Sequence, residues 1–245
     1  MDWVSSNARQ TKNYAKLFGT RAYALGAKYM KRGNAAFSTP RVPHTTPENP
    51  PSTWQNAKNT LKAFFMAPTC IFDTPTLMIY VGSALNTAAE ATYSQSNVTH
   101  VLNCADKEDM LPVFYQECVE GYYHLSLRDE SDEDASFADD PRFHSGMRDF
   151  LSAIFTSQRD PSHKATLLVH CVFGRSRSVA ICIMILFLYY QHIEAPKSMI
   201  QCYEHIGKKR KVVALQRRFL VELNKFEERF CHDTQFKENW MSIFE

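Results

Sequence analysis

The stretch Ala165–Ser178 reads ATLLVHCVFGRSRS, and it decides the fold class. Residues 165–170 form a short, almost wholly apolar run, which indicates a strand buried on both faces of a sheet. A second apolar run, Val179–Tyr190, is typical of a buried helix and is too short to span a bilayer, which takes roughly 20 residues. The sequence therefore predicts a buried strand, a tight loop and the N-terminus of a buried helix in succession.

The loop between this strand and this helix has the composition of an anion-binding site. Five residues separate Cys171 from Arg177, which is enough for the backbone to curl round one tetrahedral anion. Its N–H groups can then point inward, the helix adds its positive end, and Gly174 allows the turn. The planar guanidinium of Arg177 matches two phosphate oxygens. Cations and helix N-termini lower the pKa of a thiol from about 8.5, so the loop favours a thiolate at Cys171.

Two neighbours have predicted supporting roles. Ser178 can donate a hydrogen bond to the thiolate or stabilise it as a leaving group, and His170 can orient the loop by hydrogen bonding without acting as an acid or base. The alternative is a buried strand–turn–helix in which Cys171 merely packs. The histidine before the cysteine, the glycine three positions after it and the serine after the arginine together favour the catalytic interpretation.

Residues 170–178, HCVFGRSRS, resemble the signature loop H-C-x-x-G-x-S-R-S of the dual specificity phosphatases. Three further stretches resemble the family's opening strand, a later strand and its closing helix: Ile79–Ala84, Val98–Cys104 and Phe219–Phe226. The resemblance covers about residues 69–230. It implies that Cys171 is the nucleophile and Arg177 the phosphate clamp, without a metal or cofactor.

The family also uses an aspartate that protonates the leaving oxygen and then activates water. The pattern Leu125-Ser-Leu127-Arg-Asp129 fits the family, so Asp129 is the predicted acid and Asp132 the alternative. The resemblance implies a supporting role for Asn103. It also implies phosphate contacts from the loop residues Val172, Phe173, Gly174, Arg175, Ser176 and Arg177.

Some positions depart from the family pattern. Phe173 stands where a small residue is usual, and Leu215-Gln216 replaces a Pro-Asn pair. Arg175 would place a second cation at the mouth of the pocket, as in the phosphoinositide phosphatases of the same superfamily; the alternative is a solvent-exposed side chain. Some relatives carry a cysteine that forms a disulfide with the nucleophile, and Cys104 is the candidate here. Its alternative role is a small buried residue under the loop.

The wider pattern predicts an α/β domain with a mostly parallel or mixed central sheet flanked by helices. The expected strands are 77–81, 98–104, 122–127 and 165–170, and the expected helices are 3–31, 54–66, 83 onward, 143–156, 176–191, 196–206 and 214–230. We predict a basic N-terminal extension with a proline-rich linker at 1–67, a catalytic domain at 68–230 and a C-terminal tail at 231–245.

Charge and cysteine content limit the class of protein. The net charge of +2 argues against a nucleic-acid partner, although residues 1–50 carry eight basic and two acidic side chains. This basic arm could contact a membrane surface. Seven cysteines without paired spacing indicate neither a disulfide framework nor a zinc site. A cytoplasmic location is expected; the basic run Lys208–Lys211 leaves a nuclear location open, and the basic arm leaves a mitochondrial one open.

The leading hypothesis is a protein phosphatase that acts on phosphotyrosine and on phosphoserine or phosphothreonine. One alternative is a phosphatase of phosphoinositides or other non-protein phosphates. Another is a pseudophosphatase that binds phosphoproteins without turnover. The sequence retains Cys171, Arg177 and an acid, which favours an enzyme.

Overall fold

The protein is described from a computed structural model, which defines residues 53–107, 116–128, 137–157 and 164–244. Lys58–Glu245 forms one compact unit of the chain. The strands are β1 (Thr69–Asp73), β2 (Leu77–Ser83), β3 (His100–Asn103), β4 (Gly121–His124) and β5 (Ala165–Cys171). The helices are α2 (Thr53–Phe65), α3 (Glu90–Ser96), α4 (Pro141–Ser157), α5 (Arg177–His192), α6 (Met199–Lys209), α7 (Arg217–His232) and α8 (Thr234–Met241).

The five strands form one mixed sheet in the order β1-β2-β5-β3-β4. β2, β5, β3 and β4 run parallel, and β1 pairs antiparallel with β2 at the edge. β5 lies in the middle with all seven residues buried, as its apolar sequence requires. Its carboxyl end pairs Cys171 with Ser83 of β2 and His170 with Asn103 of β3, so three strand ends meet at the signature loop.

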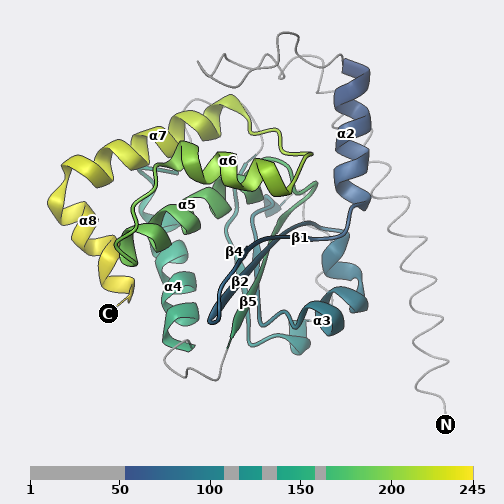
Figure 1. Ribbon diagram of the computed structural model, residues 1–245, viewed down its shortest axis with the longest axis horizontal. Helices are drawn as coiled ribbons and strands as arrows, with labels where there is room; N and C mark the ends of the chain where they lie inside the picture. Colours follow the sequence, from purple (N-terminus) through teal and green to yellow (C-terminus); the bar gives the residue numbers. More distant parts are fainter. Residues whose placement is uncertain (1–52, 108–115, 129–136, 158–163, 245) are drawn as a thin grey trace. The chain divides into compact units, whose positions relative to one another are not determined.

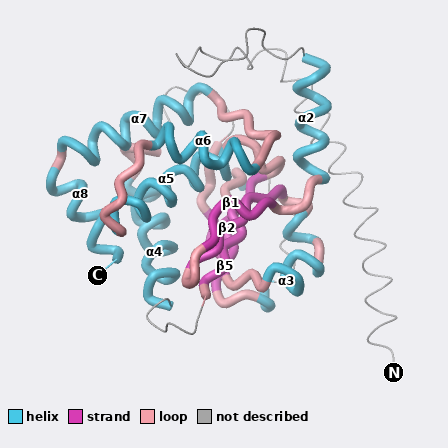
Figure 2. The backbone as a smooth tube through the Cα atoms, viewed as in Figure 1, coloured by secondary structure: helices cyan, strands magenta, loops and turns pink. Residues whose placement is uncertain are grey.

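Helices cover both faces of the sheet (Figures 1 and 2). The larger core joins β1, β2 and β5 to α4–α8, with α5 at its centre because its first twelve residues are all buried. A smaller cluster on the other face packs Tyr93 of α3 against Val101 and Leu168. This arrangement confirms the predicted fold class, a mixed α/β sheet flanked by helices.

Several elements differ from the sequence prediction. The helix expected from Ser83 is absent there: β2 runs through Ser83, whose amide donates to the side chain of Asn86 at 2.7 Å, and the next α-helix begins at Glu90. β1 was not expected. The expected tail, residues 231–245, contributes α8, whose Trp240 is buried in the core. The predicted helix 3–31 and the linker lie outside the described residues.

Candidate active site

Cys171 is the last residue of β5, and Arg177 is the first residue of α5. The five residues between them turn the chain from the sheet into the helix, as the sequence predicts. Both side chains are buried, with 3% of Cys171 and 1% of Arg177 exposed. The nucleophile predicted from sequence therefore lies at the carboxyl edge of the sheet, at the N-terminus of the most buried helix.

The backbone of this loop is held from outside through its carbonyl oxygens. Three of them accept hydrogen bonds from other elements: Val172 O from Ala84 N at 3.1 Å, Gly174 O from Arg210 Nε at 2.8 Å, and Arg175 O from Ala214 N at 3.1 Å. In a trans peptide the N–H points opposite to the C=O, and the described chain contains no cis peptide. The amides of Phe173, Arg175 and Ser176 therefore face the inside of the loop, which makes a cradle for an anion.

Gly174 is required where the loop turns. Its φ is +67°, and a Cβ there would lie 2.4 Å from the carbonyl oxygen of Gly82 on β2. No other residue fits this close approach of two backbone segments. The turn also directs the Gly174 N–H to Cys171 Sγ at 3.3 Å.

Cys171 Sγ has two hydrogen-bonding neighbours suited to a negative charge. Besides the Gly174 amide, Ser178 Oγ lies 3.4 Å away and can donate to a thiolate, which only accepts. The N-terminus of α5 adds its positive dipole. These groups stabilise an anionic sulfur, the form that attacks phosphorus.

Arg177 extends from the first turn of α5 toward the chain after β4. Its Nη1 donates to the carbonyl oxygen of Leu127 at 3.2 Å. Leu127 is buried and lies two residues before Asp129, the predicted acid. Asp129 and its alternative Asp132 lie outside the described residues, so both assignments stay predictions.

The family model for the dual specificity phosphatase catalytic domain matches residues 79–229, more than half of the chain. The chain belongs to the dual specificity phosphatase family. Solved structures with the same fold include human DUSP28, at 20% identity and a TM-score of 0.51 over 68% of this chain and 96% of that one. The Yvh1 phosphatase domain from Chaetomium thermophilum matches at 17% identity and a TM-score of 0.51, over 68% and 98% of the two chains.

A third structure of this fold is the human tyrosine phosphatase-like serine/threonine/tyrosine-interacting protein, at 18% identity and a TM-score of 0.50. It covers 67% of this chain and 98% of its own. At these identities the likeness is one of fold.

His170 lies beneath the phosphatase loop in a fully buried position. Its Nδ1 is 3.4 Å from the carbonyl oxygen of Cys171, which only accepts, so Nδ1 carries the proton. Burial lowers the pKa of His170 to about 4, and the charges of His124 and Arg177 act in the same direction. A neutral imidazole is therefore built into the base of the loop.

Asn103 and Cys104 support the loop from the end of β3. The Asn103 side chain accepts from Ala105 N at 2.9 Å and donates to Tyr122 OH at 3.0 Å. The Cys104 amide donates to His170 O at 2.7 Å. Both residues thus fix the end of β3 beside the end of β5.

The thiol of Cys104 is fully buried and unpaired with any other cysteine. Burial raises its pKa well above the ordinary value, and neighbouring Cys171 and Cys182 raise it further. The thiol lies near enough to Cys171 for an electrostatic effect, and both cysteines are free thiols in the structure. A redox role for Cys104 stays a prediction.

Arg175 is not the solvent-exposed side chain that the sequence left open as an alternative. Its side chain is 7% exposed, so it is not a solvated surface residue. Nε donates to Val212 O at 2.9 Å, and Nη1 donates to Thr60 Oγ1 of α2. These contacts tie the guanidinium to flanking chain segments, and the backbone N–H of Arg175 is the group that faces the cradle.

Helix α2 is a part of the site that the sequence interpretation missed, since it was assigned to the extension. The Phe64 ring packs edge-on against Phe173 at 5.7 Å between centroids. Ser83 Oγ donates to Phe64 O at 2.7 Å and Asn86 Nδ2 to Met66 O at 3.1 Å, so residues 58–66 pack on the β2 end and the loop. The signal was the departure from the family pattern at Phe173 and Arg175, because both residues contact α2.

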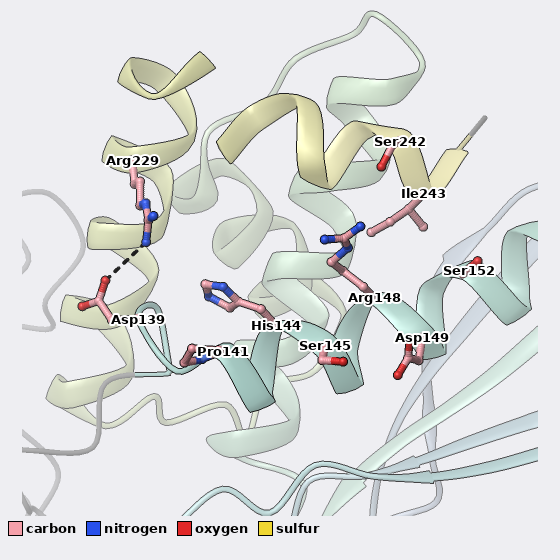
Figure 3. Close-up of a pocket in the computed structure, with 10 residues that line it drawn as sticks. All are labelled: Asp139, Pro141, His144, Ser145, Arg148, Asp149, Ser152, Arg229, Ser242 and Ile243. Carbon is pink, nitrogen blue, oxygen red and sulfur yellow. Dashed lines mark ion pairs between the residues drawn. The ribbon is translucent and has the colours of Figure 1, made fainter. Parts of the chain in front are cut away.

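A pocket of about 690 Å³ lies elsewhere, between α4 and the C-terminal helices (Figure 3). Its lining combines both signs of charge, and Arg229 pairs there with Asp139 at 3.6 Å. None of the signature residues lines it. Within the described residues, no three His, Cys, Asp or Glu side chains are placed to hold a metal, and no helix is long and apolar enough to cross a membrane.

Proposed function

We propose that this chain is an active cysteine-dependent phosphatase that hydrolyses phosphotyrosine and phosphoserine or phosphothreonine in proteins. The observation that carries the proposal is the cradle, in which inward amides surround a hydrogen-bonded Cys171 Sγ, with Arg177 as the first residue of the helix that follows. A tetrahedral dianion fits such a set of donors.

The proposed reaction has two steps. The Cys171 thiolate attacks phosphorus, the bond to the ester oxygen breaks, and that oxygen takes a proton from the predicted acid Asp129. Water, deprotonated by the same carboxylate, then attacks the phosphocysteine and releases inorganic phosphate and the thiolate. The cradle amides and Arg177 stabilise the charge on the equatorial oxygens in both steps.

We prefer a protein substrate over an inositol lipid because the Arg175 side chain is 7% exposed, which leaves little of it to contact a lipid headgroup directly. That alternative drew on Arg175 as a second cation at the pocket mouth, whereas its guanidinium contacts Val212 and Thr60.

The test is hydrolysis by the purified full-length chain. Phosphotyrosyl, phosphoseryl and phosphothreonyl peptides and vesicles that contain phosphoinositides are compared at equal phosphate, with Cys171→Ser as the control. We expect turnover of the peptides, none by Cys171→Ser, and retained vanadate binding in that variant. Faster release of phosphate from the vesicles would assign the lipid activity, and binding of phosphopeptides without turnover by the wild type would make the chain a pseudophosphatase.

A further inference from the structure

Arg210 is the one member of the basic run Lys208–Lys211 that is turned into the protein. The three lysines are exposed, as a solvated helix end would be, whereas Arg210 is 0% exposed. It follows the last residue of α6 and is among the largest fully buried side chains. A buried guanidinium is costly, so its contacts carry information about its role.

Those contacts lead to the phosphatase loop. Nε donates to Gly174 O at 2.8 Å, and Nη1 donates to Thr69 Oγ1 of β1 at 2.8 Å. Nη2 is buried without a hydrogen-bond partner. It lies 2.8 Å from the point that a Cβ on Gly174 would occupy, so the missing side chain of Gly174 is what admits the guanidinium.

The charge of Arg210 is not balanced by a carboxylate in the described part of the chain, where no ion pair involves it. Burial lowers its pKa to about 10, while the thiols of Cys171 and Cys182 act in the opposite direction. At neutral pH the group is therefore a cation, and Cys171 lies near enough to act on its charge.

The hydrogen bond to Gly174 O also sets one donor of the cradle. This carbonyl belongs to the peptide that joins Gly174 to Arg175, so holding it outward turns the Arg175 N–H inward. The other two outward carbonyls of the loop are held by backbone amides of Ala84 and Ala214. Among these three supports Arg210 is the one that acts through its side chain, so a substitution can test it.

We propose that Arg210 is a positioning residue of the phosphatase reaction, which orients the Gly174–Arg175 peptide toward the phosphoryl group and stabilises the anionic loop by its buried charge. The proposal rests on the proposed function for its kinetic part. Its electrostatic part concerns the titration of Cys171 and is independent of turnover.

Arg210→Met tests both parts, with Lys211→Met as the matched control that removes an exposed charge one residue away. Two quantities are measured on the full chain: the pH dependence of Cys171 alkylation by iodoacetamide, and kcat and KM for an aryl phosphate. Among the described residues, the titratable groups with an electrostatic effect between them and Cys171 include, besides Arg210, Arg175, Cys104 and Cys182.

For Arg210→Met we expect the alkylation midpoint to rise by about one pH unit, because a nearby cation is lost. We expect kcat/KM to fall roughly tenfold to hundredfold, less than the roughly 10²–10³ that loss of a direct oxyanion donor costs. Lys211→Met should match the wild type in both. An alkylation profile and kcat/KM within twofold of the wild type in Arg210→Met would overturn the proposal.

Arg210→Lys separates the positioning role of Arg210 from the effect of its charge. It also provides the test if Arg210→Met does not fold. It keeps a cation but cannot reproduce the planar fork, so we expect the wild-type alkylation profile with a reduced kcat. Wild-type kcat in Arg210→Lys would refute the positioning role, and an unchanged alkylation midpoint in a folded Arg210→Met would refute the electrostatic role. If no variant, including the wild type, shows turnover, the proposed function fails while the alkylation profiles still decide the electrostatic part.

Discussion

Two regions of this molecule, the signature loop and the pocket beside α4, hold their arginines in different ways. Around the signature loop, Arg177 and Arg210 are almost wholly buried and are held on carbonyl oxygens, of Leu127 and Gly174. In the pocket beside α4, Arg229 is about half exposed and pairs with Asp139 at 3.6 Å (Figure 3). It also pairs with Asp233 at 3.5 Å.

A carbonyl oxygen orients a guanidinium without neutralising it, whereas a carboxylate does both. The printed carbonyl contacts of Arg177 and Arg210 thus orient their guanidinium groups, whereas the ion pairs of Arg229 also offset its charge. The kind of acceptor that an arginine contacts thus distinguishes the signature loop from the polar pocket, although both regions contain arginines. It also indicates that a substitution at the loop should change catalysis and one at the pocket should change little.

The largest expected effect is at the predicted acid. Asp129→Asn should lower kcat by roughly 10²–10⁴ for a tyrosyl or alkyl leaving group, because the departing oxygen then lacks a proton donor. A very acidic aryl leaving group should suffer much less, since it departs without a proton. Steady-state kinetics on the two substrate types measure this, and the same pattern in Asp132→Asn with a normal Asp129→Asn would move the assignment to Asp132.

A slightly smaller effect is expected at the contact between α2 and the loop. Phe64→Ala should lower the free energy of unfolding by about 3–5 kcal/mol, as for other buried phenylalanines, and it should also lower kcat/KM because Phe173 loses its neighbour. The matched control is Phe65→Ala: Phe65 is 69% exposed where Phe64 is 4% exposed, so its effect should stay within about 0.5 kcal/mol. Urea unfolding of both variants measures the difference; equal losses would show that α2 is not anchored through Phe64.

The neutral His170 predicts a pH dependence of stability. Its pKa is about 4 in the folded protein and about 6.5 in the unfolded chain, so the unfolded state binds more protons between these values. The free energy of unfolding should be unaffected by this group above pH 6.5 and should fall by about 3 kcal/mol as the pH drops to 4.

Urea titrations at pH 7 and pH 4.5 of the wild type and His170→Asn isolate this effect from that of the carboxylates. The variant should lose less stability between the two pH values than the wild type does. An equal loss in both proteins would mean that His170 is not held neutral.

The smallest effect is expected at the pocket. Arg229→Met removes two largely exposed ion pairs, each worth about 0–1 kcal/mol, and it should leave kcat/KM unchanged. Asp233→Ala should cost more, about 1 kcal/mol, because Asp233 also accepts from Phe236 N at the start of α8. Thermal unfolding and aryl phosphate kinetics measure both effects. A large loss of activity in Arg229→Met would show that the pocket, like the signature loop, contributes to catalysis.

The sequence predicted the parts of the molecule whose signals are local. The apolar run of β5, the spacing of Cys171 and Arg177, and the long apolar helix α5 are each readable from consecutive residues. The mixed sheet follows from the alternation of such segments. The nucleophile and its loop could therefore be located from consecutive residues alone.

The missed parts depend on contacts between distant residues. Arg210 lies in a run of four basic residues, and such a run gives no sign that one member is buried. α2 was read correctly as a helix, but its packing on Phe173 connects residues more than a hundred positions apart. For α8 a signal existed: Phe236 and Trp240 are four residues apart and share one helical face.

The three outward carbonyls of the loop have a consequence for folding. Their donors come from the chain just after β2, near residue 84, and from residues 210–214, both remote in sequence from the loop they hold. The cradle dipoles are thus oriented when these segments assemble, before any phosphate arrives, and binding need not spend free energy on ordering them. A chain in which the segment after α6 has detached still presents Cys171 but has lost two of the three supports of its donors, so catalytic competence requires these long-range contacts.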